Sequence, residues 1–383
     1  MKKLLAARRW RLALLLPLLL LASCAAPVQP ETAPPEKRVK VGFYIDDGSL
    51  GSNIFTWSQL LCYSPQMEVT FLTGEDLRAG KLAGLDLLLV PGGSSARQYR
   101  SMQEEGAEAV RSFVAAGGAY FGVCAGFHCV LNRDNRLRLL PFGYVEEEVG
   151  NAARVTIDLS EKGAKLLGVA PGERSVQYSY GPIACPAEAP GDSEGEVLAT
   201  YKSTVGPYGR NGGNFYDTPA IIYGRYGKGK VIATGFHPET WPSSYDLGLG
   251  CIYAVTGVLP TPEFPVKTPR PYRVGFIVPG VIGEPPIRQM LELDREPDID
   301  LVFFSPGSIV NEGDHLDALV FPAVLPGGFD RISDYAKGSA ERFMERGGMI
   351  YAKDPAFGQL PPHKNLVHVA EDGSFAKAIR NGR

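Results

Sequence analysis

After residue 37, the hydrophobic positions form short continuous runs that alternate with longer, more polar stretches. Four of the runs have the length of strands, and residues 107–116 are the clearest helical stretch between them. Continuous apolar strands separated by helices indicate a parallel sheet that helices cover on both faces. The sequence therefore predicts an α/β fold with a doubly wound parallel sheet. The predicted strands are residues 39–45, 67–73, 85–90 and 119–123.

The same layout occurs a second time along the chain. Residues 273–356 repeat the order and spacing of residues 39–126 in four places, which is more agreement than chance explains. When the two stretches are aligned on their paired glycines, Asp354 takes the place of Cys124. The second stretch is thus predicted to be a smaller, degenerate α/β copy without a nucleophile. The matching segments are residues 41–43 and 274–276, 68–71 and 300–303, 85–86 and 316–317, and 117–118 and 347–348.

Length and proline content divide the chain in the same way. A chain of 383 residues is too long for one ordinary core and suggests about two domains. Residues 260–271 are rich in proline, so we interpret them as a linker between a first domain at 38–259 and the degenerate domain at 272–383. A half-length sheet leaves an open edge and an apolar face that another surface normally covers. We therefore expect the second domain to pack against the first or to mediate self-association.

The N-terminal residues differ from the rest of the chain. Residues 1–11 carry five basic side chains, and the apolar run at 12–22 is too short to span a bilayer comfortably. This pattern predicts an export signal at residues 1–23. The signal ends in Leu-Ala-Ser-Cys, which resembles a bacterial lipobox, and the resemblance implies that Cys24 receives a lipid and becomes the mature N-terminus. The alternatives are an ordinary signal with a chance cysteine and a lone transmembrane anchor.

Residues 24–37 are rich in Pro, Ala and Glu and show no apolar period, so they are predicted to be a flexible tether. The chain would then be exported and anchored to the cell envelope through its lipid. Because Ala25 is not an aspartate, the resemblance to bacterial lipoproteins favours the outer membrane, facing the periplasm, in a Gram-negative cell.

Composition excludes one class of partner. Without the five basic residues of the signal, 34 basic residues remain against 42 acidic ones, a net charge of −8. A mildly acidic protein has no electrostatic reason to bind nucleic acid. No cluster of residues has the spacing of metal ligands, so neither a metal nor an organic cofactor is predicted.

The cysteine count bears on disulfide pairing. The chain has six cysteines, and five remain once Cys24 is assigned to the lipid. An odd number leaves at least one thiol free, and we expect that thiol to be Cys124. Pairing of the other four is left open, with one bridge at most expected. They are Cys62, Cys129, Cys185 and Cys251.

A candidate nucleophile follows the fourth predicted strand. Residues 122–126 read Gly-Val-Cys-Ala-Gly and precede a helical stretch at 127–132. A glycine-flanked nucleophile at a sharp strand-to-helix turn is typical of a nucleophile elbow, with cysteine in place of serine. The helix N-terminus favours a thiolate at Cys124, and the N–H of Ala125 is placed to stabilise an oxyanion. A buried structural cysteine at a glycine-rich turn is the alternative.

A candidate base follows a later strand. Residues 229–235 read as a strand that runs directly into Phe-His-Pro-Glu. His237 can serve Cys124 as a base, and Glu239 can orient its imidazole. His128 is the competing candidate, but its place in the elbow helix points it along that helix rather than across the cleft.

Glycines also follow the third predicted strand. Residues 91–95 read Pro-Gly-Gly-Ser-Ser, and glycines at this position let backbone N–H groups approach a developing oxyanion. A plain strand-to-helix turn is the alternative.

Together, the Gly-Val-Cys-Ala-Gly and the distant His-Pro-Glu resemble the class I glutamine amidotransferase superfamily. Within it, residues 39–258 most resemble the N-terminal domain of eukaryotic biotin–protein ligases and its stand-alone bacterial relatives. The resemblance implies a flavodoxin-like sheet, a triad of Cys124, His237 and Glu239, and backbone donors at Gly93 and Ala125. Three segments carry the closer resemblance: residues 91–93, 117–120 and 227–230.

Several departures limit what the resemblance implies. The sequence contains no region that resembles a synthetase domain to receive ammonia, no Gly-x-x-x-x-Gly-Lys loop and no biotin ligase catalytic domain. The peptidase-like branch of the superfamily has histidine directly after the cysteine, where this chain has Ala125. Residues 135–219 are expected to shape the pocket, although no substrate group can be assigned to any of them.

Two functional hypotheses follow. The first is a thiol-dependent hydrolase or acyl transferase that acts on a small-molecule or peptide amide in the cell envelope. The second is a non-catalytic binding or scaffold protein that keeps the amidotransferase-like fold. The second hypothesis has a physical basis, because an exposed low-pKa thiol oxidises readily in an oxidising compartment.

Overall fold

The computed structural model describes residues 37–145, 152–203, 216–240, 242–278, 283–304, 315–322 and 332–383. The predicted export signal, Cys24 and residues 24–36 of the predicted tether lie outside these ranges. None of the helices within them combines the length and the apolar character that crossing a bilayer requires. Residues 37–383 form one compact unit.

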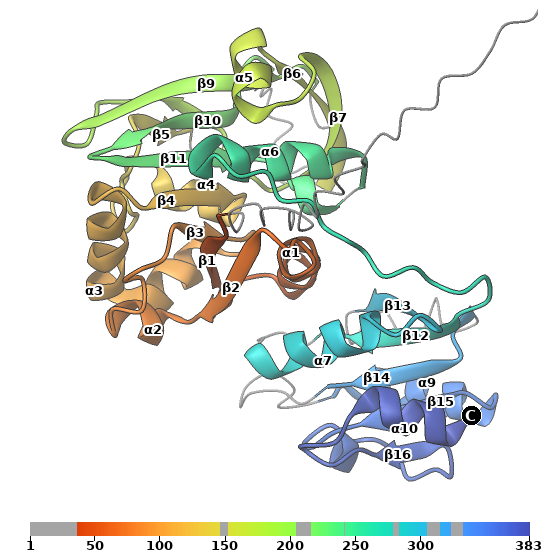
Figure 1. Ribbon diagram of the computed structural model, residues 1–383. Coiled ribbons are helices and arrows are strands. Elements are labelled where there is room, and N and C mark those ends of the chain that lie inside the picture. The colour runs from red at the N-terminus through yellow and green to blue at the C-terminus, as the bar shows by residue number, and fades with distance from the viewer. Residues whose placement is uncertain are drawn as a thin grey trace, which may run out of the picture. The chain divides into compact units, whose positions relative to one another are not determined.

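A nine-stranded sheet organises the first part of this unit, in the order β2-β1-β3-β4-β11-β10-β9-β6-β7 (Figure 1). The strands from β2 to β11 in that order pair in parallel, and this half confirms the predicted fold class. The pairs from β11 to β7 are all antiparallel. The strands are β1 Val39–Tyr44, β2 Met67–Leu72, β3 Leu87–Val90, β4 Ala119–Val123, β6 Ala152–Leu159, β7 Gly172–Ser179, β9 Ser193–Tyr201, β10 Pro219–Tyr226 and β11 Gly229–Thr234.

The antiparallel half was not predicted, and most of its strands lack continuous apolar runs; β10, with its buried residues 219–222, is the exception. In β6, the buried residues Val155, Ile157 and Leu159 alternate with more exposed ones. This period of two is typical of an antiparallel strand with one face on the core and one toward solvent. Two further short strands, β5 Phe142–Tyr144 and β8 Ala184–Pro186, pair with each other outside the main sheet.

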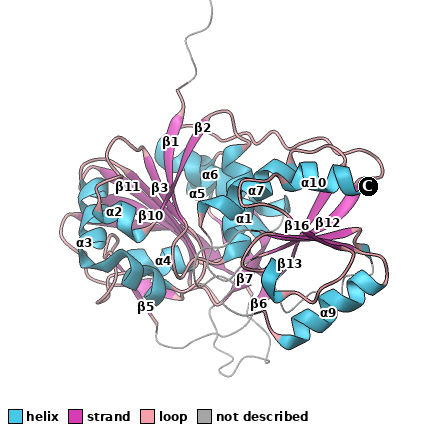
Figure 2. Cartoon of the chain, turned by 90° about the horizontal axis from the view of Figure 1, so that it is seen from below, coloured by secondary structure: helices cyan, strands magenta, loops and turns pink. Residues whose placement is uncertain are grey.

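Helices cover the nine-stranded sheet on both faces (Figure 2). Side chains of the central strands alternate between two cores, so Leu87 and Leu89 face one while Leu88 and Val90 face the other. The first core is closed by α1, α5 and α6, and the second by α2, α3 and α4. The helices are α1 Gly51–Cys62, α2 Gly74–Arg78, α3 Ser95–Ala115, α4 Ala125–Val130, α5 Glu161–Leu167 and α6 Tyr245–Thr256.

A second, five-stranded parallel sheet has the order β13-β12-β14-β15-β16. Its first four strands repeat the order β2-β1-β3-β4, which confirms the predicted smaller copy. The paired glycines make the same contact in both halves. A Cβ on Gly118 would lie 2.4 Å from the ring of Phe113, and a Cβ on Gly348 would lie 2.3 Å from the ring of Phe343. The elements are β12 Tyr272–Ile277, β13 Ile299–Phe304, β14 Ala318–Phe321, β15 Met349–Ala352, β16 Leu366–His368, α7 Glu284–Asp294, α9 Asp334–Glu345 and α10 Phe375–Gly382.

The copy is joined to the first sheet by residues 260–271, which contain no helix or strand. Hydrogen bonds hold this segment on both sides: the N–H of Glu263 donates to the carbonyl of Tyr63 at 2.9 Å, and the N–H of Thr268 donates to that of Pro297 at 2.8 Å.

Aromatic side chains connect the two sheets. Phe55 of α1 packs against Phe276 of β12 and Phe303 of β13, with ring centroids 5.4 Å apart in each pair. The hydroxyl of Tyr63 at the end of α1 donates to the Asp294 carboxylate of α7 at 2.8 Å. The apolar face of the copy therefore contacts α1, the first of the two outcomes expected from the sequence. Self-association stays a prediction.

Candidate active site

Cys124 lies at the turn between β4 and α4 with φ of 50° and ψ of −98°, a conformation that costs a residue with a side chain on the order of 1–3 kcal/mol. The glycines on either side make the turn sterically possible. A Cβ on Gly122 would lie 2.4 Å from the carbonyl oxygen of Gly126, and a Cβ on Gly126 would lie 2.2 Å from that of Val90. The local geometry is thus the strained elbow that the sequence pattern predicts.

His237 and Glu239 lie at the same end of the sheet as Cys124. Strand β11 pairs in parallel with β4, and the N–H of Cys124 donates to the carbonyl of Thr234 at 2.8 Å. Cys124, His237 and Glu239 are 4%, 5% and 1% exposed, respectively. His237 Nδ1 lies 2.9 Å from Glu239 Oε1, which leaves Nε2 as the ring nitrogen for the thiol. The structure thus brings the three predicted residues together, and their catalytic role stays a prediction.

The electrostatics of this cluster favour a protonated imidazole. Burial by itself lowers the pKa of His237, because the charged ring loses water. The negative charges of Cys124 and Glu239, together with hydrogen bonds to both, outweigh that effect and raise the pKa of His237 well above its usual range.

Asn53 of α1 is a fourth member of the cluster that the sequence analysis did not identify. It is buried, its Nδ2 donates to Glu239 Oε1, and Nδ2 lies 2.7 Å from His237 Nδ1. Glu239 Oε1 therefore accepts from both the imidazole and the amide. Glu239 Oε2 is buried and has no hydrogen-bond partner among the described residues. The sequence did contain a signal, since Asn53 follows β1 and ligand sites in parallel sheets lie beyond the carboxyl ends of the strands.

The predicted oxyanion donors lie on two loops at this end of the sheet. Ala125 is the first residue of α4, so its N–H has no partner within the helix. Gly93 has φ of 142°, and a Cβ there would lie 2.0 Å from the carbonyl oxygen of Gly48. Two backbone hydrogen bonds hold the Gly93 loop. The N–H of Leu50 donates to the carbonyl of Gly92, and the N–H of Ser94 donates to the carbonyl of Gly48. Only glycine fits at 93, and the donor role of both amides stays a prediction.

Residues 178–182 form a wall beside the sulfur. The Cys124 thiol donates to the carbonyl of Ser179 at 3.4 Å. The next residue, Tyr180, has φ of 52° and is 63% exposed. Gly181 is packed so closely that a Cβ would lie 1.7 Å from the carbonyl oxygen of Gly235. That the middle stretch shapes a substrate pocket stays a prediction.

His128 is turned away from the thiol. Its ring packs against that of Tyr144 at 5.3 Å, and burial together with the charges of Arg136 and Arg133 lowers its pKa to about 4. A histidine with so low a pKa is a weak proton acceptor, so His128 does not compete with His237 as the base for Cys124. Across the described part of the chain, no group of three or more His, Cys, Asp or Glu side chains is arranged to hold a metal.

Burial disfavours ionisation of three other cysteines, Cys62, Cys129 and Cys251. All five cysteines within the described ranges are unpaired, which is within the limit of one bridge expected from the sequence. Burial raises the pKa of Cys62 to about 11 and that of Cys129 to about 12, and it also raises the pKa of Cys251.

Fold and site together define a class of α/β proteins with a glycine-flanked cysteine at a strand-to-helix elbow and a histidine after the neighbouring strand. The chain belongs to the class I glutamine amidotransferase-like superfamily. It is 30% identical over 203 residues to the pyridoxal 5'-phosphate synthase subunit PdxT of Methanoculleus marisnigri, which covers 52% of this chain and 90% of that protein. The superfamily inferred from the sequence motifs is confirmed by this relative.

The narrower resemblance also has support. Residues 64–130 match the family described as "Biotin-protein ligase, N terminal". The biotin–protein ligase of Schizosaccharomyces pombe is 29% identical over 174 residues, or 41% of this chain, and the chain spans 26% of that ligase.

Among solved structures, PurLQS from Thermotoga maritima matches with 16% identity and a TM-score of 0.43, over 56% of this chain and 98% of that one.

Proposed function

We propose that the chain catalyses thiol-dependent acyl transfer from an amide. His237 holds the proton of the Cys124 thiol in the ion pair, and the sulfur attacks the amide carbonyl carbon as a thiolate. The oxyanion is stabilised by the N–H groups of Ala125 and Gly93, as hydrogen-bond donors aimed at developing charge do in other acyl transfers. His237 then gives its proton to the departing amine, which leaves a thioester on Cys124. Attack by water, with His237 as base, releases a carboxylic acid and restores the thiol.

The observation that carries this proposal is that the strained backbone of Cys124 lies beside the charged imidazole of His237. Cys124 adopts a costly backbone conformation, and the group buried beside it is an imidazole whose pKa is raised by the sulfur and by Glu239. Strained residues cluster at functional sites, where the surrounding structure fixes them. A merely structural cysteine needs neither the strain nor a buried His and Glu.

Membership of the superfamily supports a carboxamide such as that of glutamine as the substrate group. The proposal ends at hydrolysis or transfer to a small acceptor. The chain spans 26% of the biotin–protein ligase of Schizosaccharomyces pombe, so the ligase activity named for that relative is not part of the proposal.

One observation favours the alternative of a non-catalytic binding or scaffold protein. The Ser179 carbonyl oxygen lies 3.4 Å from the Cys124 sulfur and accepts a hydrogen bond from the thiol. A thiolate cannot donate this hydrogen bond and would face the carbonyl dipole, so the contact favours the neutral thiol. In a catalytic protein, substrate binding would have to move this carbonyl away from the sulfur.

The test is covalent labelling with a glutamine analogue that carries a diazoketone, followed by intact mass and peptide mapping. Iodoacetamide serves as a general thiol reagent, and Cys124→Ser is the matched variant. The catalytic proposal predicts one label from the analogue, on Cys124, and none in Cys124→Ser. The scaffold alternative predicts no reaction with the analogue, or modification spread over several thiols. Either of those results would overturn the proposal.

We further propose that the chain is an envelope lipoprotein, anchored through Cys24. The support is the lipobox-like sequence at the end of the predicted signal. The unaltered protein is expected to incorporate labelled fatty acid and to partition into detergent, whereas Cys24→Ala should be released or stay uncleaved. An unaltered protein that remains unlabelled and in the aqueous phase would contradict this localisation.

A further inference from the structure

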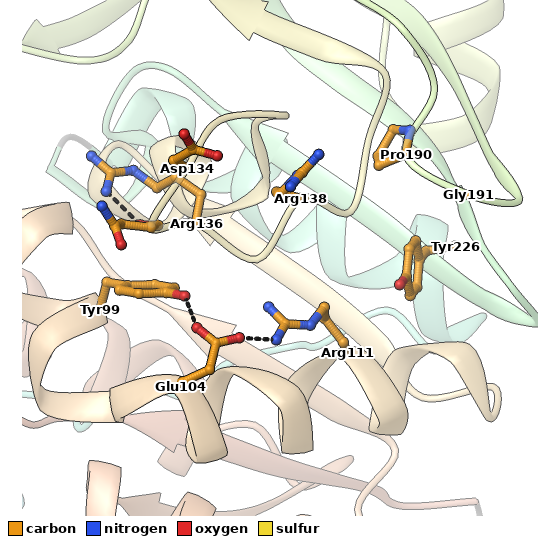
Figure 3. Close-up of a pocket in the computed structure, with 10 residues that line it drawn as sticks. Tyr99, Glu104, Arg111, Asp134, Arg136, Arg138, Pro190, Gly191 and Tyr226 are labelled. Carbon is orange, nitrogen blue, oxygen red and sulfur yellow. Dashed lines mark hydrogen bonds and ion pairs between the residues drawn. The ribbon is translucent and has the colours of Figure 1, made fainter.

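A cavity of about 710 Å³ lies outside the candidate active site (Figure 3). Its walls come from α3, from the loop after α4, from the turn at Pro190 and Gly191, and from the end of β10. None of its lining residues is Cys124, His237 or Glu239. A volume between about 300 and 1,000 Å³ is typical of small-molecule sites.

Charged side chains dominate the cavity, and one pair of them is neutralised within the protein. The charged lining residues are Glu104, Arg111, Asp134, Arg136 and Arg138. Arg111 forms an ion pair with Glu104 and a second with Glu108 at 2.8 Å. Glu104 also accepts a hydrogen bond from the hydroxyl of Tyr99. The Tyr99–Glu104–Arg111 chain of contacts along one wall is visible in Figure 3. This wall therefore supplies hydrogen-bonding groups but little net charge.

The other two arginines have no carboxylate within ion-pair distance in the part of the chain that the structure describes. Arg136 donates to the carbonyl of Asn135 at 2.7 Å and to Ser95 Oγ at 3.2 Å. Arg138 donates only through Nε, to Asn132 Oδ1 at 3.0 Å. Both terminal amino groups of Arg138 are thus left for a ligand.

The backbone holds these two arginines toward the cavity. Burial alternates along residues 136–139: Leu137 and Leu139 are fully buried, and the two arginines are more exposed. The N–H of Leu137 donates to the backbone carbonyl of Cys129 at 2.8 Å, which holds the segment against α4. Arg138 has φ of 54°, a conformation that is costly for a residue other than glycine. A cation held in a strained position is a feature that function rather than stability explains.

The position of Arg138 is reinforced by its neighbour. Asn132 Nδ2 donates to the carbonyl of Glu188 at 2.8 Å, so the amide that binds Arg138 Nε is itself fixed. A guanidinium pre-oriented in this way loses little freedom when its remaining N–H groups bind an oxyanion in a forked geometry.

We propose that this cavity binds a small molecule that carries a phosphate or carboxylate on a ring. The oxyanion would bind the terminal amino groups of Arg138, with Arg136 beside it. Tyr99 and Tyr226 line the cavity on either side of the arginines in Figure 3 and offer aromatic surface for the ring. The proposal is independent of the chemistry at Cys124.

The experiment is isothermal titration calorimetry of the full chain with phenyl phosphate, inorganic phosphate and benzoate. Phenyl phosphate or benzoate should bind, and inorganic phosphate should bind more weakly because it lacks the ring. Arg138→Gln should weaken the binding by about tenfold or more, as expected for the loss of a charged hydrogen-bonding partner. Arg136→Gln should also weaken it. Arg100→Gln is the matched control, an exposed arginine of α3 outside the cavity.

Three results would overturn the proposal. These are no measurable binding of either ring compound, equal losses in Arg138→Gln and Arg100→Gln, or full loss of binding in Cys124→Ser. Thermal unfolding of each variant accompanies the titration. Gln keeps the Cβ and therefore the same backbone strain at position 138, so Arg138→Gln is expected to leave the Tm close to that of the unaltered protein. If that variant fails to fold, Arg136→Gln against Arg100→Gln decides the question.

Discussion

The imidazole of His237 lies directly against the backbone of Gly92, so that a Cβ at position 92 would be 2.4 Å from His237 Cε1. Real Cβ atoms do not approach a neighbour this closely, so any side chain at 92 must displace the ring. The glycine of the Pro-Gly-Gly loop thereby determines where the candidate base can stand.

Gly92→Ala should therefore lower the rate at which the glutamine analogue labels Cys124, by on the order of 100-fold, because small misplacements of reacting groups are costly. The rate is measured by intact mass against time. Gly106→Ala is the control, since a Cβ there would meet its nearest neighbours at an ordinary 3.5 Å. Labelling of Gly92→Ala at the unaltered rate would show that the position of His237 does not matter.

The charge on His237 should be visible in the pH dependence of the thiol. Cys124 and Glu239 raise the pKa of His237, so the imidazolium persists well above pH ~6.5, the usual midpoint for histidine. His237→Gln removes this cation. The pH at which iodoacetamide alkylation of Cys124 is half-maximal should therefore rise. The alkylation rate below that midpoint should fall roughly tenfold for each pH unit by which the midpoint rises.

The raised pKa also sets the sign of a stability effect. A histidine whose pKa is higher in the folded state stabilises that state fully below pH ~6.5 and loses the effect as pH rises through the folded value. His237→Gln should thus cost more stability at pH ~6 than at high pH in urea unfolding. A variant with an unchanged alkylation profile and a pH-independent loss of stability would argue against the ion pair.

Asn53 is expected to act as a positioning residue through Glu239. Asn53→Leu keeps the volume but removes a hydrogen bond to a charged group, a contribution of about 1.5–3 kcal/mol. Labelling by the analogue should fall by on the order of tenfold, and the midpoint of the alkylation profile should move with it. Thr56→Ala, on the same helix, should change neither. A fall in Tm with an unaltered pH profile would assign Asn53 a purely structural role.

Phe55 of α1 should stabilise both sheets, because it is fully buried against the aromatic residues Phe276 and Phe303 of the second sheet. Phe55→Ala is expected to cost about 3–5 kcal/mol in the free energy of unfolding, the range for truncating a buried aromatic side chain. Val266→Ala, at a position that is 87% exposed, should stay within about 0.5 kcal/mol. Chemical denaturation measures both. A small loss in Phe55→Ala would mean that the two sheets are only weakly joined.

The features that the sequence predicted are those whose chemistry is local. The elbow requires a glycine two positions before Cys124 and another two positions after it, and β4 is a continuous apolar run, so both can be read within a few residues. His237 and Glu239 were found because they are two residues apart at the end of a strand. The fold class followed from the same continuous runs.

What the sequence did not indicate depends on long-range contacts. Asn53 meets His237 across 184 positions in the chain, so its place after β1 puts it near the ligand end of the sheet without indicating this contact. The strands β6 and β7 were missed because buried and more exposed residues alternate along them, which leaves no continuous apolar run. The arginines of the second cavity lie in a loop, where only the burial of Leu137 and Leu139 reveals which way the others turn.

The helix α1 contains Asn53, beside His237, and two positions later Phe55, beside the second sheet. The duplicated half, which has no cysteine at Asp354, thus shares a rigid element with the elbow's partner groups. Free energies that act on a shared element are reciprocal. A displacement of α1 by the degenerate copy would therefore reach Asn53 and, through its contacts, His237 and Glu239.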